Sequence, residues 1–467
     1  MQIAIVILAA GKGTRLKSKR AKVLHEIGGQ ALLKHVVDAA RQVVPPQDIY
    51  AIVGHQAEAV EAALRTTGIH FVRQDEQLGT GHAVQCAERA TRGYEHIIVL
   101  SGDVPLLKAK TILALRDFHI DRRAAMTIVT ADVPHPEGYG RIVRKSSHSD
   151  EITAIVEQKQ LQPRQALIHE INSGIYAFRR ETLYELIGQL HTENPHQELY
   201  LTDMAKILTH GGQHVVALQI GDQHELLGAN TIPEMMELDR TLRRETAQRL
   251  MLNGVVIQRP DTVVLDSSVE VGPDTVIEPY VQLLGHTKVG SDCTIRSYTV
   301  IENTSVEDEV VIRQNCVITN AVIHRGAILG PFAHVRPDSS VGEGAHVGNF
   351  VELKKARLGR GSKANHLAYL GDVEVGDYSN IGAGAITCNY DGQLKHRTLI
   401  GDRVFVGSNA TLVAPLVVGS GAYVAADSCI TEDVAEDDLA IARAKQINKQ
   451  GWAKNRRAQA DSRKPLS

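Results

Sequence analysis

The sequence is poor in aromatic side chains, which make up 4% of its 467 residues and include one tryptophan. Globular cores usually owe much of their buried area to Phe, Tyr and Trp, so much of this chain must pack around smaller side chains. Hydrophobic residues still reach 43%, which is enough to build cores and argues against a disordered chain. The length predicts two or three domains.

Cysteine is also scarce. The five cysteines are scattered along the chain, are odd in number and form no CxxC pair. This pattern argues against a disulfide framework and against a structural zinc site, and it fits reduced thiols in a cytoplasmic protein.

The chain has no excess of charge of one sign and no long hydrophobic run. Lys and Arg number 51 and Asp and Glu 54, a net charge of −3, so we expect neither nucleic acid nor an anionic membrane as a partner. No apolar run approaches the roughly 18–20 residues needed to span a bilayer. The apolar start has no basic residue before it and leads straight into Gly11, which predicts a buried strand rather than a signal peptide.

The first half alternates two kinds of segment. Short apolar runs rich in branched residues occupy 3–8, 49–53, 97–100 and 126–129, and helical patterns such as 32–43 and 80–90 lie between them. This alternation predicts an α/β domain with a Rossmann-like, mostly parallel sheet covered by helices on both faces. Ligands of such sheets bind beyond the carboxyl ends of the strands.

A single helical pattern joins the two halves. Thr231 can cap it, Pro233 lies in its first turn, and Asn253-Gly254 can end it. We therefore expect a domain at 1–230, a helical linker at 231–253 and a second domain at 254–467.

The second half changes to a period of six. Aliphatic or small residues recur at every sixth position, with occasional phase slips, from Val271 to Ile430. This period fits neither a helix nor a flat strand and is typical of hexapeptide repeats, which form a left-handed parallel β-helix. Three hexads make one coil with the aliphatic side chain inward, which accounts for the lack of aromatics; the series predicts about nine coils.

Two segments interrupt or follow this period. Residues 388–399 break the series and predict an ejected loop, and such loops are often functional. From Arg443 to the end the chain carries eight Lys or Arg and one acid. This basic tail can close the β-helix, contact an anionic ligand or simply remain solvated.

A glycine-rich turn follows the first apolar run, with the sequence Leu8-Ala9-Ala10-Gly11-Lys12-Gly13-Thr14-Arg15-Leu16. It matches neither the dinucleotide fingerprint nor the Walker A loop. Its glycines let backbone N–H groups approach an anion, and Arg15 and Lys22 add positive charge. An ordinary strand-to-helix turn is the alternative, but the preceding strand and the basic residues favour anion binding.

Other short motifs lie at the expected ends of strands. Asp103 follows the run 97–100, where a carboxylate suits Mg²⁺, although it could instead cap the next helix. Residues 77–82 precede a helix and offer amides to a base or phosphate. Residues 138–141 and 170–174 are expected to form turns beside strands.

Together these segments resemble the sugar-nucleotide pyrophosphorylases over most of residues 1–230. The motifs LAAGKGTRL, KVLH, QLGTGHA, GDVP, GYGRI and NSG occur in that order, which is a specific match. They are most similar to the uridylyltransferase half of the bifunctional N-acetylglucosamine-1-phosphate uridylyltransferase/glucosamine-1-phosphate acetyltransferase family. Ala21 and Ser101 replace the family's usual Pro and Tyr, and neither change removes a charge.

The resemblance implies site residues for uridylyl transfer. Lys22 and Arg15 would contact the phosphates, and Asp103 and Asn230 would hold Mg²⁺. The residues implied to bind UDP-N-acetylglucosamine are Leu8, Ala9, Ala10, Gly11, Lys22, Gln74, Gly79, Thr80, Ser101, Gly102, Asp103, Gly140, Glu157, Asn172 and Asn230. Among them Gln74, Gly79 and Thr80 would read the uracil, and Gly140, Glu157 and Asn172 the N-acetyl sugar. Catalysis would rest on positioning and on charge neutralisation by Mg²⁺, Lys22 and Arg15.

The β-helix could be only a spacer, but three features argue otherwise. Residues 349–358 place two lysines and an arginine on a coil, His366 stands near Tyr369, and the loop containing Asn389-Tyr390 is ejected nearby. A lone histidine on a β-helix is usually structural; His366 differs because cations suited to a phosphate lie one coil away.

This set resembles the acetyltransferase half of the same family. It implies that His366 is the general base, because the sugar amine must lose a proton before it attacks acetyl-CoA, and a neutral imidazole accepts one near pH 7. The residues implied to bind glucosamine 1-phosphate are Arg336, Lys354, Tyr369 and Asn380. Those implied to bind acetyl-CoA are Ala383, Asn389, Tyr390, Ser408, Ala426 and Arg443. Family members are homotrimers with acetyl sites between subunits.

The resemblance covers nearly the whole chain and implies a cytoplasmic bacterial-type enzyme of UDP-N-acetylglucosamine synthesis. It would acetylate glucosamine 1-phosphate and then couple the product to UTP, supplying precursors of peptidoglycan and lipopolysaccharide. A pyrophosphorylase for another sugar with an inert β-helix is an alternative that His366 and Asn389-Tyr390 argue against. A purely structural hexapeptide trimer is another, and it would release neither CoA nor pyrophosphate.

Overall fold

The computed structural model describes residues 2–146, 149–194 and 197–461. The backbone contacts divide the chain into two compact units, Met1–Thr246 and Ala247–Ser467. The last residues of the basic tail, 462–467, lie outside the described part.

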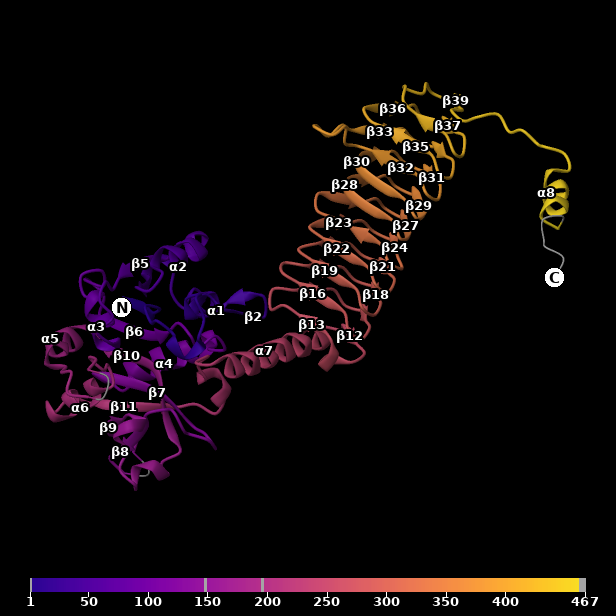
Figure 1. The fold of residues 1–467 in the computed structure, drawn as a ribbon. Coiled ribbons are helices and arrows are strands. Elements are labelled where there is room, and N and C mark those ends of the chain that lie inside the picture. Colours follow the sequence, from indigo (N-terminus) through magenta and orange to yellow (C-terminus); the bar gives the residue numbers. More distant parts are fainter. Residues whose placement is uncertain (1, 147–148, 195–196, 462–467) are drawn as a thin grey trace. The chain divides into compact units, whose positions relative to one another are not determined.

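The first unit is built on a nine-stranded mixed sheet (Figure 1). Seven strands cross it in the order β11 (Val215–Gln219), β7 (Met126–Asp132), β10 (Glu170–Arg179), β6 (His96–Ser101), β1 (Ile3–Leu8), β4 (Ile49–Val53) and β5 (His70–Arg73). β8 (Arg141–Arg144) pairs with β10 and with β9 (Ile152–Val156). Only β10 is antiparallel to its neighbours among the seven, which confirms the expected mostly parallel sheet.

Side chains alternate between two apolar layers along β1. Ile3, Ile5 and Ile7 pack on one face of the sheet and Ala4 and Val6 on the other. The first face is covered by α1 (Leu32–Ala40), α2 (Ala57–Leu64) and α4 (Ala109–Asp121). The second is covered by α3 (Thr80–Cys86), α5 (Arg180–Leu186) and α6 (Asp203–His210). The helices predicted at 32–43 and 80–90 are longer than α1 and α3. After Ala40 and Cys86 the chain continues as turns.

Helix α7 (Ile232–Leu252) occupies the segment expected to be a linker, but its two ends belong to different cores. Met235 and Leu238 pack with Ile27 and Leu32 of the first unit. Ala247 and Leu250, each 1% exposed, pack in the core of the second. The division between the units therefore falls inside the helix, after Thr246.

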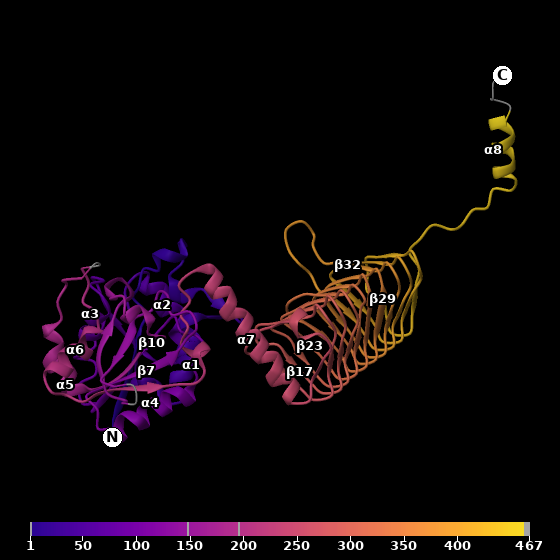
Figure 2. The ribbon, with the colours of Figure 1, turned by 90° about the horizontal axis from the view of Figure 1, so that it is seen from below.

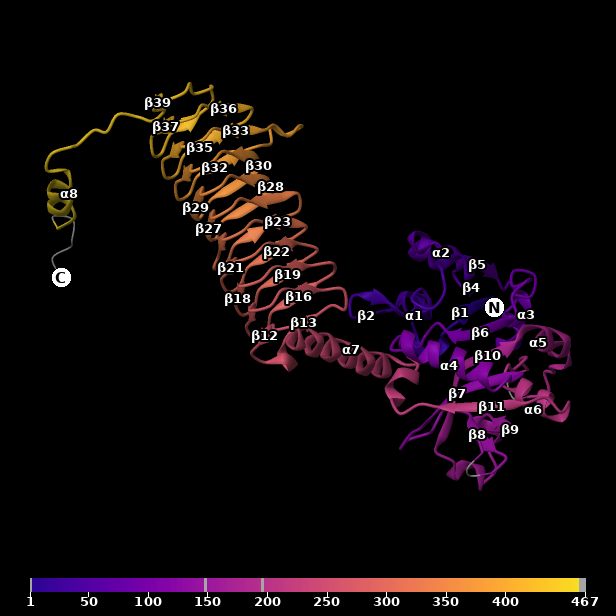
Figure 3. The same cartoon turned by 180° about the vertical axis from the view of Figure 1, so that it is seen from behind.

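The second unit is a parallel β-helix, as predicted (Figures 1 and 3). One face is a sheet of eleven short strands, from β12 (Val256–Ile257) to β39 (Leu439–Ala440). The other faces share a 17-stranded sheet, because β28 (Glu352–Leu358) and β30 (Tyr369–Val375) run round the corner between them. Most interior coils repeat every 17 or 18 residues, as where Val276 pairs with Thr294 and Lys288 with Ser305.

The prediction of about nine coils misses the ends of the β-helix, since eleven strands stack on one face. The six-residue series begins at Val271 and ends at Ile430, so it misses β12 and β39. Both join the stack through irregular steps, with Val256 paired to Val276 and Tyr423 to Leu439.

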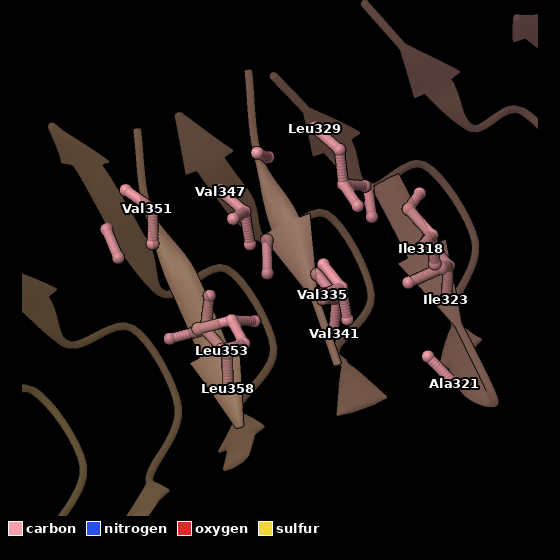
Figure 4. Close-up of a cluster of buried hydrophobic side chains, with 14 of the residues drawn as sticks. Ile318, Ala321, Ile323, Leu329, Val335, Val341, Val347, Val351, Leu353 and Leu358 are labelled. Atoms are coloured by element: carbon pink, nitrogen blue, oxygen red, sulfur yellow. The ribbon is translucent and has the colours of Figure 1, made fainter. Parts of the chain in front are cut away.

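The core of the β-helix consists of Val, Ile, Leu, Ala and Cys side chains. Figure 4 shows successive coils pointing Ile318, Val335 and Leu353 inward, one above another. These side chains are 0% exposed, and the narrow interior leaves no room for rings. This packing explains the low aromatic content of the chain.

Several rings of the β-helix lie outside, on a row we call the aromatic corner. It consists of Tyr280, Tyr298, Phe332, Phe350 and Leu367, which occupy equivalent corners of the coils. All have positive φ, between 50° and 64°, a region that bulky L-residues rarely adopt. Phe350 and Leu367 are 57% and 63% exposed.

Among the described residues, no helix is both long and apolar enough to cross a membrane.

Candidate functional site

A cavity of about 540 Å³ opens at the carboxyl ends of β1 and β6 in the first unit. The structure brings twelve of the predicted residues to its wall. They are Leu8, Ala9, Ala10, Gly11, Arg15, Lys22, Gln74, Gly79, Thr80, Ser101, Asp103 and Asn230. Residues as far apart as Leu8 and Asn230 therefore meet at one sheet edge, as parallel strand ends do.

The ends of β1 and β6 lie side by side because Leu8 pairs with Ser101. The Gly102 N–H donates to the Leu8 carbonyl at 2.9 Å. A Cβ at Gly102 would lie 2.8 Å from that carbonyl, so only glycine permits the close approach. Gly102 does not line the cavity itself; it shapes the wall by joining these two strand ends.

Lys22 lies between the two predicted metal ligands. Its ammonium donates to a carboxylate oxygen of Asp103 and, at 2.9 Å, to the side-chain oxygen of Asn230. The side chains of Lys22 and Asp103 are 13% and 25% exposed. Gln56 holds the preceding loop, because its side chain accepts from the Ala21 N–H at 2.9 Å and donates to the Lys19 carbonyl at 2.7 Å. The cavity thus carries the Lys22 ammonium, held by two oxygen atoms that accept its hydrogen bonds.

The loop before α3 forms another part of the wall. Gly79 has φ 112°, and a Cβ there would lie 2.6 Å from the Leu199 carbonyl. The Gly81 N–H donates to that carbonyl at 2.8 Å, and the Leu201 N–H donates to the Thr80 hydroxyl at 3.0 Å. The segment around Leu199 therefore holds this loop against the cavity.

Three predicted sugar residues do not line the cavity: Gly140, Glu157 and Asn172. Asn172 donates its N–H to the Gly140 carbonyl at 2.9 Å and accepts from the Gly174 N–H at 3.1 Å. Ser101, on the wall, contacts the Gly174 carbonyl at 3.4 Å, so this group continues outward from the cavity. Glu157 accepts from Thr202 at 3.1 Å.

The expected turn at 170–174 is wrong, because these residues begin β10. The pairing of β10 with β7 shifts register between Asn172 and Tyr176, and Gly174 has φ 75°. An Asn-Ser-Gly bulge inside a strand has the composition of a turn, which explains the misassignment.

In the β-helix, three predicted phosphate or sugar ligands lie on neighbouring coils of one face. Val335 pairs with Leu353, which places Arg336 beside Lys354, and Lys354 pairs with Gly371 in turn. Tyr369 pairs with Glu352, and Arg336 donates to Glu352 at 2.9 Å. The fourth, Asn380, lies on the eleven-stranded sheet beside Lys363.

His366 ends β29 (Lys363–His366) at the edge of these two faces and immediately precedes Leu367 of the aromatic corner. Its side chain is exposed, and Asn349 lies beside it on the preceding coil. A hollow of about 130 Å³ next to His366 is lined by Arg313, His346 and Asn349, among others. Burial, with Lys363 and Arg313 nearby, lowers the pKa of His346.

The predicted acetyl-CoA residues fall into separate groups within one chain. Ala383 and Ser408 follow the same corner as His366 on later coils, since their carbonyls accept from the N–H groups of Asn409 and Asp427 at 2.7 and 2.8 Å. Ala426 continues this row, two residues beyond Val424, which pairs with Val406. Asn389 and Tyr390 lie at another corner, and Arg443 is an exposed residue beyond β39.

The loop expected at 388–399 leaves the coil near β32 (Figure 2) but is shorter, covering residues 389–397, because β32 (Ile386–Cys388) ends at Cys388 and β33 (Thr398–Ile400) begins at Thr398. Asn389 is 7% exposed and donates to Asp372, whereas Tyr390 is 60% exposed. The N–H groups of Leu394 and Gln393, together with His396, hold the pKa of Asp391 well below its usual range. The loop is thus an ordered projection, not a loose one.

Two family models match the chain. One, described as a MobA-like NTP transferase domain, matches residues 5–174; the other, a bacterial transferase hexapeptide (six repeats), matches 268–303 and 320–355. The bifunctional protein GlmU of Koribacter versatilis (strain Ellin345) is 55% identical over 464 residues, 99% of either chain. GlmU of Solibacter usitatus (strain Ellin6076) is 47% identical over 456 residues, 97% of each chain. GlmU of Streptococcus agalactiae serotype V is 43% identical over 451 residues, 96% of this chain and 97% of that one.

The chain belongs to the GlmU family of bifunctional proteins.

This membership confirms the family that the motifs predicted. The chain is a bifunctional transferase of UDP-N-acetylglucosamine synthesis, with a nucleotidyltransferase unit and a hexapeptide acetyltransferase unit. It excludes both an inert β-helix and a purely structural trimer. GlmU membership also indicates a divalent metal cofactor.

Sequence reasoning missed several residues of the cavity wall, above all Glu198. Lys12, Thr14 and Gln77 also line it and lie within motifs already recognised. Glu198 has no such context, because it stands in an irregular segment with no periodicity. It reaches the wall only because Leu199 packs against the loop at Gly79.

Proposed function

We propose that the cavity of the first unit binds UTP and N-acetylglucosamine 1-phosphate and is where UMP is transferred. The observation that carries this proposal is the convergence of the glycine-rich turn, Arg15, Lys22, Asp103 and Asn230 on one cavity. Its backbone N–H groups and two cations suit a triphosphate, and its volume of about 540 Å³ suits a nucleotide with a sugar phosphate.

The metal is Mg²⁺, held by Asp103 and Asn230. A carboxylate and an amide oxygen are the hard donors that Mg²⁺ prefers, usually together with substrate phosphates. The position of the Lys22 ammonium between these two oxygens supports the assignment, because it marks a place where they stabilise positive charge. When bound, Mg²⁺ supplies neutralisation of the phosphate charge.

In the reaction, a phosphate oxygen of the sugar phosphate attacks the α-phosphorus of UTP in line, and the bond to pyrophosphate breaks. Lys22 and Arg15 stabilise the charge on the phosphates, and Leu8, Ala9, Ala10 and Gly11 cradle the nucleotide. Gln74, Gly79 and Thr80 bind the uracil. Ser101 and Gly102 shape the floor beneath the phosphates, and Gly140, Glu157 and Asn172 bind the N-acetyl sugar.

The β-helix acetylates glucosamine 1-phosphate. His366 takes a proton from the amine, the amine nitrogen attacks the thioester carbonyl of acetyl-CoA, and CoA leaves as the thiol once protonated. Arg336, Lys354, Tyr369 and Asn380 bind the sugar phosphate. Ala383, Asn389, Tyr390, Ser408, Ala426 and Arg443 bind acetyl-CoA.

The working form is a homotrimer with acetyl sites between subunits. The aromatic corner supports this, because bulky side chains at positive φ lie exposed in a single chain. His366 adjoins this row, so a second copy packed on it would bring its own residues to the base. The separation of His366 from Asn389 and Tyr390 within one chain supports the same conclusion.

We place the enzyme in the cytoplasm. The free state of the cysteines among the described residues supports this location, as does the dependence of both reactions on UTP and acetyl-CoA.

Two assays on the full chain test the proposal. Pyrophosphate release from UTP should require N-acetylglucosamine 1-phosphate and should disappear with EDTA and return with Mg²⁺. CoA release should require acetyl-CoA and glucosamine 1-phosphate and should persist in EDTA. Pyrophosphate release in EDTA would refute the metal role, and preference for another sugar phosphate would refute the substrate.

A further inference from the structure

The side chain of Gln74 is held by contacts that the transfer reaction does not explain. Gln74 follows β5, is 3% exposed and lies on the wall of the cavity. Its amide nitrogen lies 3.1 Å from the Gly79 carbonyl and 3.1 Å from Nδ1 of His82. Its backbone carbonyl accepts from the Gln77 side chain at 3.0 Å. Both ends of the residue are therefore fixed.

The Gly79 carbonyl determines which way the amide points. A carbonyl oxygen only accepts hydrogen bonds, so the amide atom facing it must be the nitrogen. Gly79 cannot move away, because Leu199 lies against it and the loop is hydrogen-bonded to this segment. A flipped amide would set two oxygens against each other.

His82 determines the same orientation from a second direction. The amide nitrogen has two N–H groups, and its second contact is Nδ1 of His82, which must therefore be an acceptor. The ring proton then sits on Nε2, which lies 3.8 Å from the Cys86 sulfur. Burial raises the pKa of Cys86, so a thiol rather than a thiolate faces the ring.

With both N–H groups engaged, the side-chain oxygen of Gln74 is left to face a ligand. None of the described residues donates to it. Uracil presents an N3–H donor on its Watson–Crick edge, whereas cytosine presents an acceptor at N3. An oxygen at this place therefore favours uracil and repels cytosine.

We propose that His82 is a positioning residue for nucleotide choice, which acts by holding the Gln74 amide so that its oxygen accepts from uracil N3–H. The proposal rests on the uridylyl transfer proposed above and deepens it. His82 itself does not line the cavity, so its effect reaches the base only through Gln74. The preference for UTP should therefore depend on the hydrogen-bond acceptor of the side chain at position 82 and not on its volume.

The test compares His82→Asn with His82→Leu in the full chain. Asn places an oxygen near the position of Nδ1, and Leu has almost the same shape without an acceptor. The measurement is kcat/KM for pyrophosphate release with UTP and with CTP, each with N-acetylglucosamine 1-phosphate and Mg²⁺. We expect the Leu variant to lose about 10- to 100-fold of the preference for UTP, and the Asn variant to keep most of it. Gln74→Leu should lose the preference as the Leu variant does.

If the two His82 variants show the same preference for UTP over CTP, whether retained or lost, the proposal is overturned. Calorimetric titration with UTP and CTP compares the binding of the two nucleotides without turnover. If the unchanged chain releases no pyrophosphate, the proposed uridylyl transfer is refuted, but the binding preference still tests the role of His82. If the Leu variant does not fold, the folded Asn variant decides: a ratio near that of the unchanged chain supports the role, and a lost ratio overturns it. CoA release should be unchanged in every variant.

Discussion

The two units assemble their sites in different ways. In the first unit the sheet brings twelve of the predicted residues to one cavity, although they come from segments between Leu8 and Asn230. In the β-helix the predicted residues lie along two corners and two faces, and the hollow beside His366 is lined by none of the others. Parallel strand ends converge at a sheet edge, whereas a solenoid displays side chains one coil apart on an outer surface. The proposed uridylyl site therefore draws on one chain, and the proposed trimer would bring another surface to the acetyl site.

The largest difference should appear when Asp103 is replaced by Asn. Loss of the carboxylate weakens Mg²⁺ binding by several kcal/mol, so uridylyl transfer should fall by at least about 10³-fold. Acetyl transfer should remain near that of the unchanged chain. Pyrophosphate and CoA release measure the two reactions, with Asp117→Asn, at an exposed residue, as the matched control. Parallel loss of both activities would contradict two independent sites.

His366→Ala should have the reverse effect. Removal of the general base should lower kcat for acetyl transfer by about 10²–10⁴-fold while KM for acetyl-CoA changes little. Uridylyl transfer with added N-acetylglucosamine 1-phosphate should be unaffected. His286→Ala, at another exposed histidine of the β-helix, is the control. Nearly full acetyl transfer in the His366 variant would make this histidine structural.

Phe350→Asp tests the dependence of the second site on another copy. Asp tolerates the positive φ of 55° at this corner, so the coil should fold, but a charge there should prevent association. We expect a monomer by light scattering, little acetyl transfer and normal uridylyl transfer. Tyr378→Asp makes the same change at another corner, at φ 54° and 58% exposure, and should leave the trimer intact. A trimeric Phe350 variant would place the interface elsewhere.

Fragments test whether the β-helix needs the first unit. A fragment from Ala247 to the C-terminus should be an active acetyltransferase trimer, because the solenoid buries its own aliphatic side chains. A fragment from Gly254 should also fold but with a lower unfolding temperature, since it lacks Ala247 and Leu250, each 1% exposed. Burial of a leucine is worth about 2–3 kcal/mol, and calorimetry should show the first fragment several degrees more stable. Equal unfolding temperatures of the two fragments would show that the end of α7 does not stabilise the β-helix core.

The smallest effect concerns acid stability. Burial lowers the pKa of His119, in the first unit, from 6.5 to about 3. The unfolded state therefore takes up the proton first, so the contribution to stability is full above pH 6.5 and is lost as pH falls toward 3. Between pH 6.5 and 5 the first unit should lose about 2 kcal/mol.

Calorimetry across this pH range should show the loss in the transition of the first unit, and His119→Gln should reduce its slope. Among the described residues of the β-helix no histidine is fully buried, so its transition should shift less. A slope that the variant leaves unchanged would assign the acid sensitivity to other groups, such as His35 or His96, whose pKa values burial also lowers.

Most of the fold could be predicted because its strands and coils have strong local patterns. The runs at 3–8 and 49–53 coincide with β1 and β4, and the six-residue period identifies the β-helix. The bulge at Asn172 could not be distinguished from a turn, and the terminal coils were missed where spacing becomes irregular. Most of the cavity wall was predictable from motifs. Glu198 was not, because its place depends on tertiary contacts of an irregular segment.

The loop at 389–397 shows how a solenoid accommodates added chain. The strands on either side of it keep their partners, with Thr387 beside Leu412 and Val373 beside Thr398. The extra residues thus leave the stack at one corner and disturb no neighbouring ladder. A different loop could be inserted at a corner of this kind, or at the same corner of another coil. The strand pairing of the β-helix would keep its register. Protein design could use the coil number to set the spacing between such inserted loops.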